Sequence, residues 1–186
     1  MKKPVLTKPV FRKPVLQKPL LTKPVFRKPD LTAGEIKSLT VSLIISLGTG
    51  ILSVLLTGGG MRQYADLYKP PLAPPGWLFP IVWTILYILM GVASWRIYES
   101  QGSDRRLALS LYGNQLLLNM VWPLLFFELK VYFFAFAWLL LLWLLIYLTI
   151  RQFLPIDRRA GLLLVPYLVW VTFAGYLNFA IALHYL

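Results

Sequence analysis

Five apolar runs, each about 20 residues long, constrain this chain more than any other feature of its sequence. They cover residues 39–57, 77–97, 107–127, 131–150 and 161–183, and no acidic or basic residue lies in their interiors. A helix of this length spans the hydrocarbon core of a bilayer and satisfies its own backbone hydrogen bonds. The alternating pattern of a membrane barrel is absent. The sequence therefore predicts an all-α membrane protein, a bundle of five transmembrane helices.

Composition excludes several other classes of protein. Hydrophobic residues make up 58% of the 186 positions, which is too apolar for a soluble domain of this length. The chain has no cysteine, so disulfides, thiolate catalysis and cysteine-ligated metals are excluded. The first 30 residues lack the long apolar core and the cleavage site of a secretory signal, which we therefore do not expect.

Basic residues are distributed unevenly between the two sides of this layout. Of the nineteen Lys and Arg residues, sixteen fall on the side of the N-terminus: nine in residues 1–30, then Lys37, and three each in the connections 96–106 and 151–159. The other side holds only Arg62, Lys69 and Lys130. Loops rich in Lys and Arg stay in the cytoplasm of plasma or inner membranes. We therefore expect a cytoplasmic N-terminus and a C-terminus on the opposite side.

The N-terminal segment is a five-residue repeat in which a Lys-Pro pair recurs from residues 3–4 to 28–29. A proline at every fifth position forbids a helix or a central strand. We expect a disordered tail over residues 1–36, followed by a transmembrane domain over residues 37–186. The tail is either a tether to anionic lipid headgroups or a solvated segment without a role. No folded reading element accompanies its charge, so nucleic acid is not expected as a partner.

The first membrane helix has a face of small residues that predicts close packing, and the connection after it has the features of a lid. Ser42, Ser46, Gly50 and Ser53 place small residues on one face of the first helix, which is typical of close helix contacts. The connection 58–76 is the longest between the runs, and its glycines and prolines combine hinge positions with stiff segments. Long ordered connections of this kind often act as lids.

The third run carries carboxamides, which are the strongest indication of an internal site. Gln115, Asn119 and Trp122 follow a spacing of i, i+4 and i+7 and therefore share one helix face. An unpaired carboxamide in hydrocarbon costs several kcal/mol, on the order of 4–8. This face must turn inward, where it either bonds neighbouring helices or lines a pocket.

Aromatic residues form matching stripes on the second and fifth runs. Trp83 and Tyr87 lie one turn apart on the second, and Trp170, Ala174 and Asn178 follow Tyr167 on the fifth. Trp is commonly a belt residue at the membrane interface, but Trp83 and Trp170 lie well inside their helices. A buried indole needs a partner for its N–H. We therefore expect these stripes to line a cavity.

Ionisable residues offer little to catalysis or ion transport. His184 is the only histidine and lies at the end of the fifth run, so it predicts an interfacial polar group rather than a haem ligand. All seven acidic residues lie at the termini or in connections. Proton relays and ion-coupled pumps need an ionisable group at membrane depth, so neither class is expected, and no metal site is predicted.

At these stripes the sequence resembles the translocator protein family, also called the tryptophan-rich sensory protein or peripheral-type benzodiazepine receptor family. The resemblance covers residues 37–185. It rests on motifs that occur in order along the five runs: Lys69-Pro70, Pro74-Pro75-Gly76-Trp77, Phe79-Pro80, Val82-Trp83-Thr84, Leu86-Tyr87, Gln115-Leu116, Leu118-Asn119, Trp122, Phe126-Phe127, Ala160-Gly161, Pro166-Tyr167, Trp170, Ala174 and Tyr176-Leu177-Asn178.

The resemblance implies a five-helix bundle, often a homodimer, whose first connection caps a pocket for porphyrins and, in some members, for cholesterol or synthetic ligands. It places Tyr64, Gln115, Asn119, Trp122 and Ala174 in that pocket, together with the two tryptophans named above. With the stripes, the predicted ligand-binding set is Tyr64, Trp83, Tyr87, Gln115, Asn119, Trp122, Tyr167, Trp170, Ala174 and Asn178. The predicted lid residues are Lys69, Pro70, Pro74, Pro75 and Trp77.

Two departures from the family pattern bear on these expectations. Many members have Trp-Tyr where this chain has Gln63-Tyr64, so one lid aromatic is missing. The family's cholesterol motif needs a basic residue after a tyrosine, whereas Tyr185 is followed only by Leu186. Cholesterol recognition by that route is therefore not expected.

The leading functional hypothesis is a membrane receptor or carrier for a tetrapyrrole or a similar flat apolar ligand, linked to tetrapyrrole transport or to stress and pigment regulation. The ligand would be protoporphyrin or a haem-like compound held without covalent attachment. One alternative is a light-dependent porphyrin-degrading enzyme, in which the resemblance assigns the chemistry to Trp83 and Trp170. The other is a regulatory membrane adaptor in which the basic tail is the working part.

Overall fold

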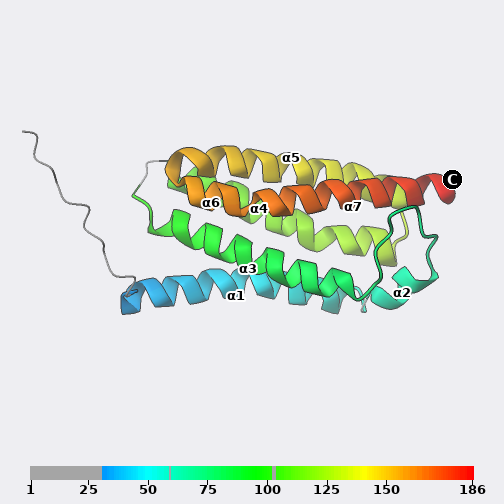
Figure 1. Ribbon diagram of the computed structural model, residues 1–186, viewed down its shortest axis with the longest axis horizontal. Helices are drawn as coiled ribbons and strands as arrows, with labels where there is room; N and C mark the ends of the chain where they lie inside the picture. Colours follow the sequence, from blue (N-terminus) through cyan, green and yellow to red (C-terminus); the bar gives the residue numbers. More distant parts are fainter. Residues whose placement is uncertain (1–30, 59, 102–103) are drawn as a thin grey trace, which may run out of the picture. The chain divides into compact units, whose positions relative to one another are not determined.

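The computed structural model describes residues 31–58, 60–101 and 104–186, without the side chains of residues 61 and 62. The Lys-Pro tail, about which the sequence makes its most specific prediction outside the membrane, lies outside the described residues. Within residues 31–186, the described secondary structure is helical throughout (Figure 1). The elements in chain order are α1 (Ala33–Leu56), α2 (Met61–Asp66), α3 (Leu78–Glu99), α4 (Arg105–Pro123), the π-helix η1 (Leu124–Glu128), α5 (Tyr132–Ile156), α6 (Arg158–Leu163) and α7 (Val165–His184).

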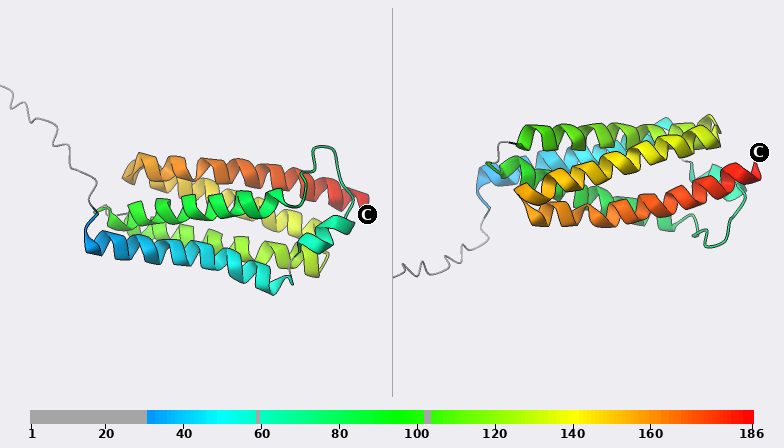
Figure 2. Two further views of the ribbon diagram at one scale, coloured as in Figure 1. Left: turned by 60° about the horizontal axis from the view of Figure 1, so that its bottom comes forward. Right: turned by 90° about the horizontal axis from the view of Figure 1, so that it is seen from above.

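The long helices lie side by side along a common direction, with α1 and α3 adjacent and α5 beside α6 and α7 (Figures 1 and 2). The short helix α2 and the C-terminus lie at one end, and the start of α1 lies at the other (Figure 2). The predicted all-α bundle is therefore confirmed.

The start of α1 differs from the predicted boundary at residue 39. Thr32 and Glu35 form a capping box in which Glu35 N–H donates to Thr32 Oγ1 at 3.3 Å and Thr32 N–H donates to Glu35 Oε2 at 2.8 Å. This pairing satisfies backbone donors at the helix start and begins the helix at Ala33, before the apolar run. The helix therefore begins six residues before the approximate start at residue 39, which followed hydropathy alone.

Three further boundaries differ for similar local reasons. The helix α5 continues past the predicted end at residue 150 to Ile156 and includes Pro155 in its last turn. The predicted fifth run begins earlier, at Arg158, where Asp157 Oδ1 accepts hydrogen bonds from Arg159 N–H at 2.8 Å and from Ala160 N–H at 3.1 Å. That run is also divided at Leu164 into α6 and α7, because Pro166 cannot donate a backbone hydrogen bond.

The predicted third run, residues 107–127, is two elements rather than one. The α-helix α4 ends at Pro123, and η1 follows with the wider hydrogen bonding of a π-helix, in which Leu129 N–H donates to the carbonyl of Leu124 at 3.0 Å. A proline removes one backbone donor and favours such local changes of pitch. The residues after Pro123 therefore face directions that an uninterrupted α-helix would not give them.

Four helical segments of the described chain are long and apolar enough to cross a membrane: α1, α3, α5 and Arg158–His184, which joins α6 and α7. The helix α4 has 19 residues but is less apolar, since Asn114, Gln115 and Asn119 lie within it. Two of these carboxamides are almost fully buried, with exposed fractions of 1% for Gln115 and 3% for Asn119. The surrounding helices thus cover the polar face of α4, as its stripe predicted.

Small residues bring α1 and α3 into close contact. A Cβ atom added to Gly50 would lie 2.4 Å from Cε2 of Tyr87, and one added to Gly91 would lie 3.1 Å from the Cα of Leu43. Ser46, on the same face of α1, is fully buried and bonds Tyr112 OH at 2.6 Å. The small face predicted on the first helix is therefore a contact face, at least at positions 46 and 50.

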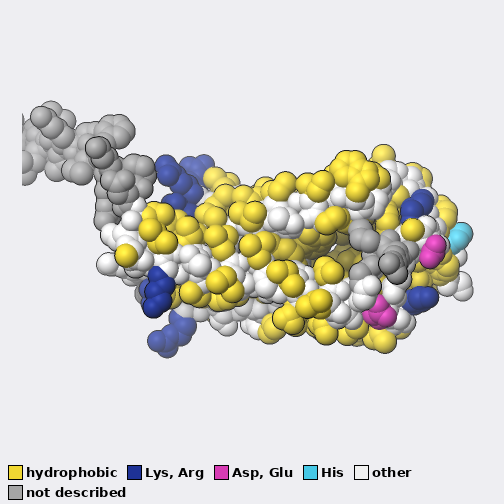
Figure 3. Space-filling model, turned by 90° about the horizontal axis from the view of Figure 1, so that it is seen from below, with side chains coloured by type: hydrophobic (Ala, Val, Ile, Leu, Met, Phe, Trp, Pro, Cys, Tyr) yellow, Lys and Arg dark blue, Asp and Glu magenta, His cyan; other side chains and the backbone are white. Residues whose placement is uncertain are grey.

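On the face shown in Figure 3, hydrophobic side chains lie along the middle of the bundle and charged side chains lie toward its ends. On α1, large side chains such as Ile44, Ile45 and Leu56 are more than half exposed. A belt of exposed aliphatic residues is what lipid contact requires, because hydrocarbon chains replace water around these side chains.

Candidate functional site: an aromatic cavity within the bundle

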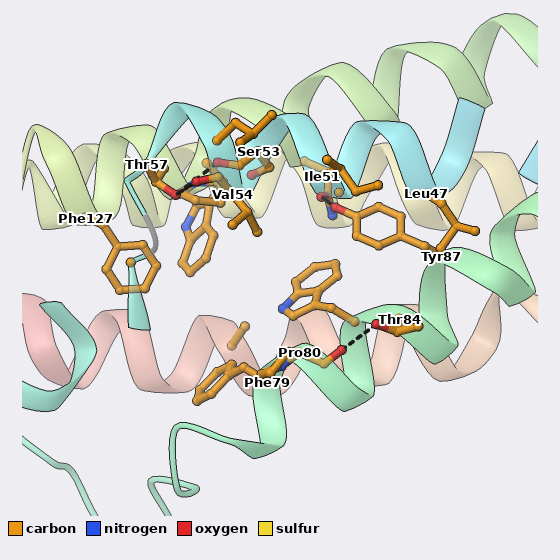
Figure 4. Close-up of a pocket in the computed structure, with 18 of the residues that line it drawn as sticks. Leu47, Ile51, Ser53, Val54, Thr57, Phe79, Pro80, Thr84, Tyr87 and Phe127 are labelled. Carbon is orange, nitrogen blue, oxygen red and sulfur yellow. Dashed lines mark hydrogen bonds between the residues drawn. The ribbon is translucent and has the colours of Figure 1, made fainter. Parts of the chain in front are cut away.

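A cavity of about 380 Å³ lies between α1, α3, α4, η1 and α7 (Figure 4). Aliphatic and small side chains of α1 form one wall, and aromatic side chains form most of the rest. The lining residues are Leu47, Gly50, Ile51, Ser53, Val54, Leu55, Thr57, Gly60, Phe79, Pro80, Trp83, Thr84, Tyr87, Asn119, Trp122, Pro123, Phe127, Trp170 and Ala174. No charged side chain is among them, so the cavity suits an apolar ligand.

Two of the hydroxyl groups at the cavity wall are already bonded to a carbonyl four residues earlier in the chain. Thr57 Oγ1 donates to the carbonyl of Ser53 at 3.0 Å, and Thr84 Oγ1 donates to the carbonyl of Pro80 at 2.7 Å (Figure 4). Back-bonding of this kind is the usual way for a hydroxyl to satisfy its donor within a helix. These side chains therefore add little polarity to the cavity.

Three tryptophans reach the cavity from three different helices. Trp122 of α4 donates its Nε1–H to Asn178 Oδ1 at 3.1 Å, whereas Trp83 of α3 lies with its ring centre 5.6 Å from that of Tyr87. Trp170 of α7 differs from both, because its Nε1 atom is buried and has no acceptor in the described part of the chain. A buried donor without an acceptor is costly, which sets this indole apart from the other two.

A chain of hydrogen bonds fixes the inner end of the cavity. Tyr87 OH donates to Asn119 Oδ1 at 2.6 Å, and Asn119 Nδ2 donates to Tyr167 OH at 2.7 Å. The three residues come from α3, α4 and α7 and are all buried. The carboxamide of Asn119 therefore lines the cavity but is committed to two tyrosines.

Six of the ten predicted ligand-binding residues line the cavity: Trp83, Tyr87, Asn119, Trp122, Trp170 and Ala174. The other four lie behind the wall. Tyr167 and Asn178 hold Asn119 and Trp122, respectively, and Asn178 Nδ2 also donates to the carbonyl of Tyr132 at 2.9 Å. Gln115 is buried with its Nε2 4.0 Å from Met90 Sδ, and its Oε1 has no partner among the described residues.

Tyr64, the fourth residue that does not line the cavity, belongs to the connection between α1 and α3. Its OH donates to the carbonyl of Pro74 at 2.8 Å, and its ring meets the cavity residue Phe79 edge-on, with ring centres 4.8 Å apart. Lys69 Nζ lies 3.8 Å from the centre of the Tyr64 ring and also donates to the Tyr64 carbonyl. Burial raises the pKa of the Tyr64 phenol, which therefore stays protonated and keeps donating to Pro74.

The same connection is attached to the C-terminal part of α7. Tyr176 OH donates to the carbonyl of Pro71 at 2.9 Å, and Tyr185 OH accepts from the backbone N–H of Tyr68 at 3.2 Å. The Tyr68 ring stacks on His184 with centres 4.0 Å apart. The predicted lid segment is thus an ordered strap, in which Pro70 is buried, whereas Trp77 is 66% exposed and does not line the cavity.

Sequence reasoning missed the α1 wall and two phenylalanines. Phe79 lies four residues before Trp83, so the stripe on α3 could have included it. Leu47, Ile51 and Val54 carry no comparable signal, because large aliphatic residues also lie on the other faces of α1. Phe127 reaches the cavity only through the changed pitch of η1.

The membrane-length helices and this cavity together define a multi-pass integral membrane protein with an uncharged, largely aromatic cavity. The sequence model of the TspO/MBR family matches residues 40–184. The chain therefore belongs to the TspO/MBR family, and the resemblance drawn from its motifs is confirmed.

Relatives from bacteria and mammals agree with this assignment. Tryptophan-rich protein TspO of Chlorobaculum tepidum is 42% identical over 150 residues, which are 79% of this chain and 95% of that protein. Tryptophan-rich sensory protein of Cereibacter sphaeroides is 42% identical over 116 residues, 62% of this chain and 72% of that protein. Translocator protein of Bos taurus is 37% identical over 147 residues, 77% of this chain and 87% of that protein.

Proposed function

We propose that this protein is a membrane receptor or carrier that binds a flat, largely apolar ring compound of the tetrapyrrole type in the aromatic cavity. The observation that carries this proposal is the convergence of Trp83, Trp122 and Trp170 on one uncharged space. Aromatic faces prefer offset-stacked or edge contacts with other rings, at about 0.5–1.5 kcal/mol per pair beyond area burial. A large planar ligand gains several such contacts at once.

The free donor of Trp170 supports a polar contact to such a ligand. Both atoms of the Asn119 carboxamide are occupied by tyrosines, and Gln115 lies behind the wall. The Nε1–H of Trp170 is the buried indole donor that has no acceptor within the described residues. We therefore propose that it donates to a ring nitrogen or a carboxylate at the edge of the ligand, which removes the cost of leaving it unpaired.

The names of the relatives agree with a role in moving or sensing a ligand, since they include a translocator protein and a sensory protein. The strap from α2 to α3 supports the same role. It contacts the cavity residue Phe79 through Tyr64 and is held at α7 by Tyr176. Release of these contacts would change access to the cavity without breaking any membrane helix.

The proposal is tested by titrating the purified full-length protein with protoporphyrin and following the shift of the porphyrin absorption band. Trp170→Phe keeps an aromatic ring but removes the N–H. Loss of this N–H is expected to weaken protoporphyrin binding by about 2- to 13-fold, which corresponds to about 0.5–1.5 kcal/mol for one hydrogen bond. Trp83→Leu removes a stacking face and is expected to weaken binding by a similar factor.

Trp143→Phe is the matched control. Trp143 lies on α5 outside the cavity lining, and its Nε1–H donates to Thr172 Oγ1 at 2.8 Å. This variant is expected to bind like the wild type. Equal affinities of the Trp170→Phe, Trp83→Leu and wild-type proteins would refute the assignment of the cavity as the binding site.

A further inference from the structure

A second hollow lies on the outside of the bundle, between α3 and the α6–α7 segment. Its volume is about 450 Å³, and it is lined by Leu89, Val92, Arg96, Arg159, Leu162, Leu163 and Pro166. It shares no lining residue with the aromatic cavity. Two guanidinium groups and a set of aliphatic side chains thus meet in one open groove.

The charged and the apolar residues of this groove lie at different distances from the end of the bundle. On α3, Val92 and Leu89 lie four and seven residues before Arg96, so Leu89 is about 10 Å from Arg96 along the helix. On the antiparallel segment, Leu163 and Pro166 lie four and seven residues after Arg159, over a similar length. Both walls therefore carry an arginine at the end of the bundle and aliphatic side chains toward its middle.

The arginine of α3 is held in place but is only partly bonded. Arg96 Nη2 pairs with Asp157 Oδ2 at 2.6 Å, and Asp157 is itself fixed by the backbone N–H groups of Arg159 and Ala160. The Nε atom of Arg96 is buried without an acceptor in the described part of the chain. The guanidinium is therefore oriented by its ion pair and retains unused donors.

Arg159 supplies the second positive charge. It is exposed, and its guanidinium has no hydrogen bond to any described residue, because only its backbone N–H is engaged. Asp157 compensates one of the two arginines, so the groove keeps a net positive charge. The surrounding end of the bundle is also basic, with Arg105, Arg106 and Arg151 on neighbouring elements.

We propose that this groove binds an anionic phospholipid, with the phosphate at Arg96 and Arg159 and one acyl chain along Leu89, Val92, Leu163 and Pro166. Guanidinium groups bind phosphate oxygens through two parallel hydrogen bonds. Basic pockets between membrane helices recognise the headgroups of anionic lipids. The aliphatic part of the groove continues into the lipid-facing surface, so an acyl chain enters it without leaving the bilayer.

The neighbouring residue Arg158 provides a matched control. Arg158 and Arg159 both lie in the first turn of α6 and both are exposed, but only Arg159 lines the groove. Arg158→Gln and Arg159→Gln remove the same charge from the same turn. Both variants keep the basic residues 1–30, so any lipid binding by that segment is the same in the two proteins.

The experiment measures retention of dioleoyl-phosphatidylglycerol by the full-length protein in detergent, using native mass spectrometry with dioleoyl-phosphatidylcholine as the competing lipid. The wild type and Arg158→Gln are expected to prefer phosphatidylglycerol equally. Arg159→Gln is expected to lose roughly tenfold in relative affinity, the size of one charge-assisted hydrogen bond. Glycerophosphoglycerol, which has the headgroup without acyl chains, is expected to compete poorly.

Three results would overturn the proposal. The wild type could show no preference between the two lipids. The two arginine variants could lose affinity to the same extent, which would show general attraction to the basic end of the bundle. Glycerophosphoglycerol could compete as well as the intact lipid, which would show that the aliphatic walls contribute nothing.

Discussion

The contact between Gly50 and Tyr87 makes a sharp prediction about the stability of the bundle. A Cβ atom at position 50 would lie 2.4 Å from Cε2 and 2.8 Å from Cδ2 of the Tyr87 ring. The ring is 7% exposed, and its OH is bonded to Asn119 at 2.6 Å, so it has little room to move. Gly50→Ala therefore forces α1 away from α3. Overpacking of this kind costs about 1–3 kcal/mol.

Gly48 supplies the control, because a Cβ atom at that position would meet nothing within 4 Å. Both substitutions gain up to about 1 kcal/mol of helix propensity, and this gain cancels when the two variants are compared. Gly50→Ala is therefore expected to be less stable than Gly48→Ala by about 1–3 kcal/mol. Thermal unfolding in detergent, followed by circular dichroism, measures the difference, with roughly 2–4 °C per kcal/mol for a chain of this size.

A double variant identifies the ring as the cause. In a Tyr87→Ala background the clash is gone, so adding Gly50→Ala is expected to cost nothing further. Equal stability of the Gly48→Ala and Gly50→Ala proteins would refute the reasoning. A full cost for Gly50→Ala in the Tyr87→Ala background would assign the effect to some other contact.

Two further predictions concern the ends of the helices. Burial raises the pKa of Asp157, but the Arg96 hydrogen bond and the backbone donors of α6 outweigh burial, so the pKa lies below its ordinary value of 3.8. The stability that the ion pair with Arg96 contributes is therefore present above pH 3.8, and it is lost as the pH falls through the lower pKa of the folded protein. Asp157→Asn is therefore expected to unfold at a lower temperature than the wild type at pH 7, with the difference shrinking as the pH falls below 3.8. A difference that stays constant as the pH falls would contradict this account. The orientation in the membrane can be tested with single cysteines, because the chain has none of its own. In bacterial host cells, we expect a membrane-impermeant maleimide to label Leu129→Cys from outside and Gln101→Cys only after lysis. The reverse labelling pattern would show that the predicted orientation is inverted.

The sequence predicted the helices well because hydropathy and stripe patterns are local properties. The carboxamide stripe on α4 correctly indicated a buried polar face, and the aromatic residues at positions 83 and 170 line the cavity. The ends of helices were less accurate, because hydropathy does not register a polar first turn. The pattern Thr32-x-x-Glu35 is itself a capping signal and would have placed the start of α1 correctly.

Whether a buried polar residue lines the cavity or supports its wall could not be predicted from the sequence. Asn119 and Gln115 lie one turn apart on the same face, yet only Asn119 reaches the cavity. The difference depends on partners from α3 and α7, namely Tyr87 and Tyr167, whose positions follow from helix packing. A one-dimensional pattern identifies the face of a helix, whereas the depth of each residue within the fold requires the neighbouring helices.

The π-helix η1 has a consequence for comparing this chain with its relatives. A π-turn accommodates one more residue than an α-turn, so deleting a single residue between Leu124 and Leu129 would rotate the side chains on one flank by about 100° relative to the other. Phe126 is buried in the core, whereas Phe127, with its ring at 85° to that of Phe126, faces the cavity. Phe127 would then turn away from the cavity without any change in hydropathy. A relative with one residue fewer in this segment would therefore present a different side chain to the corresponding cavity.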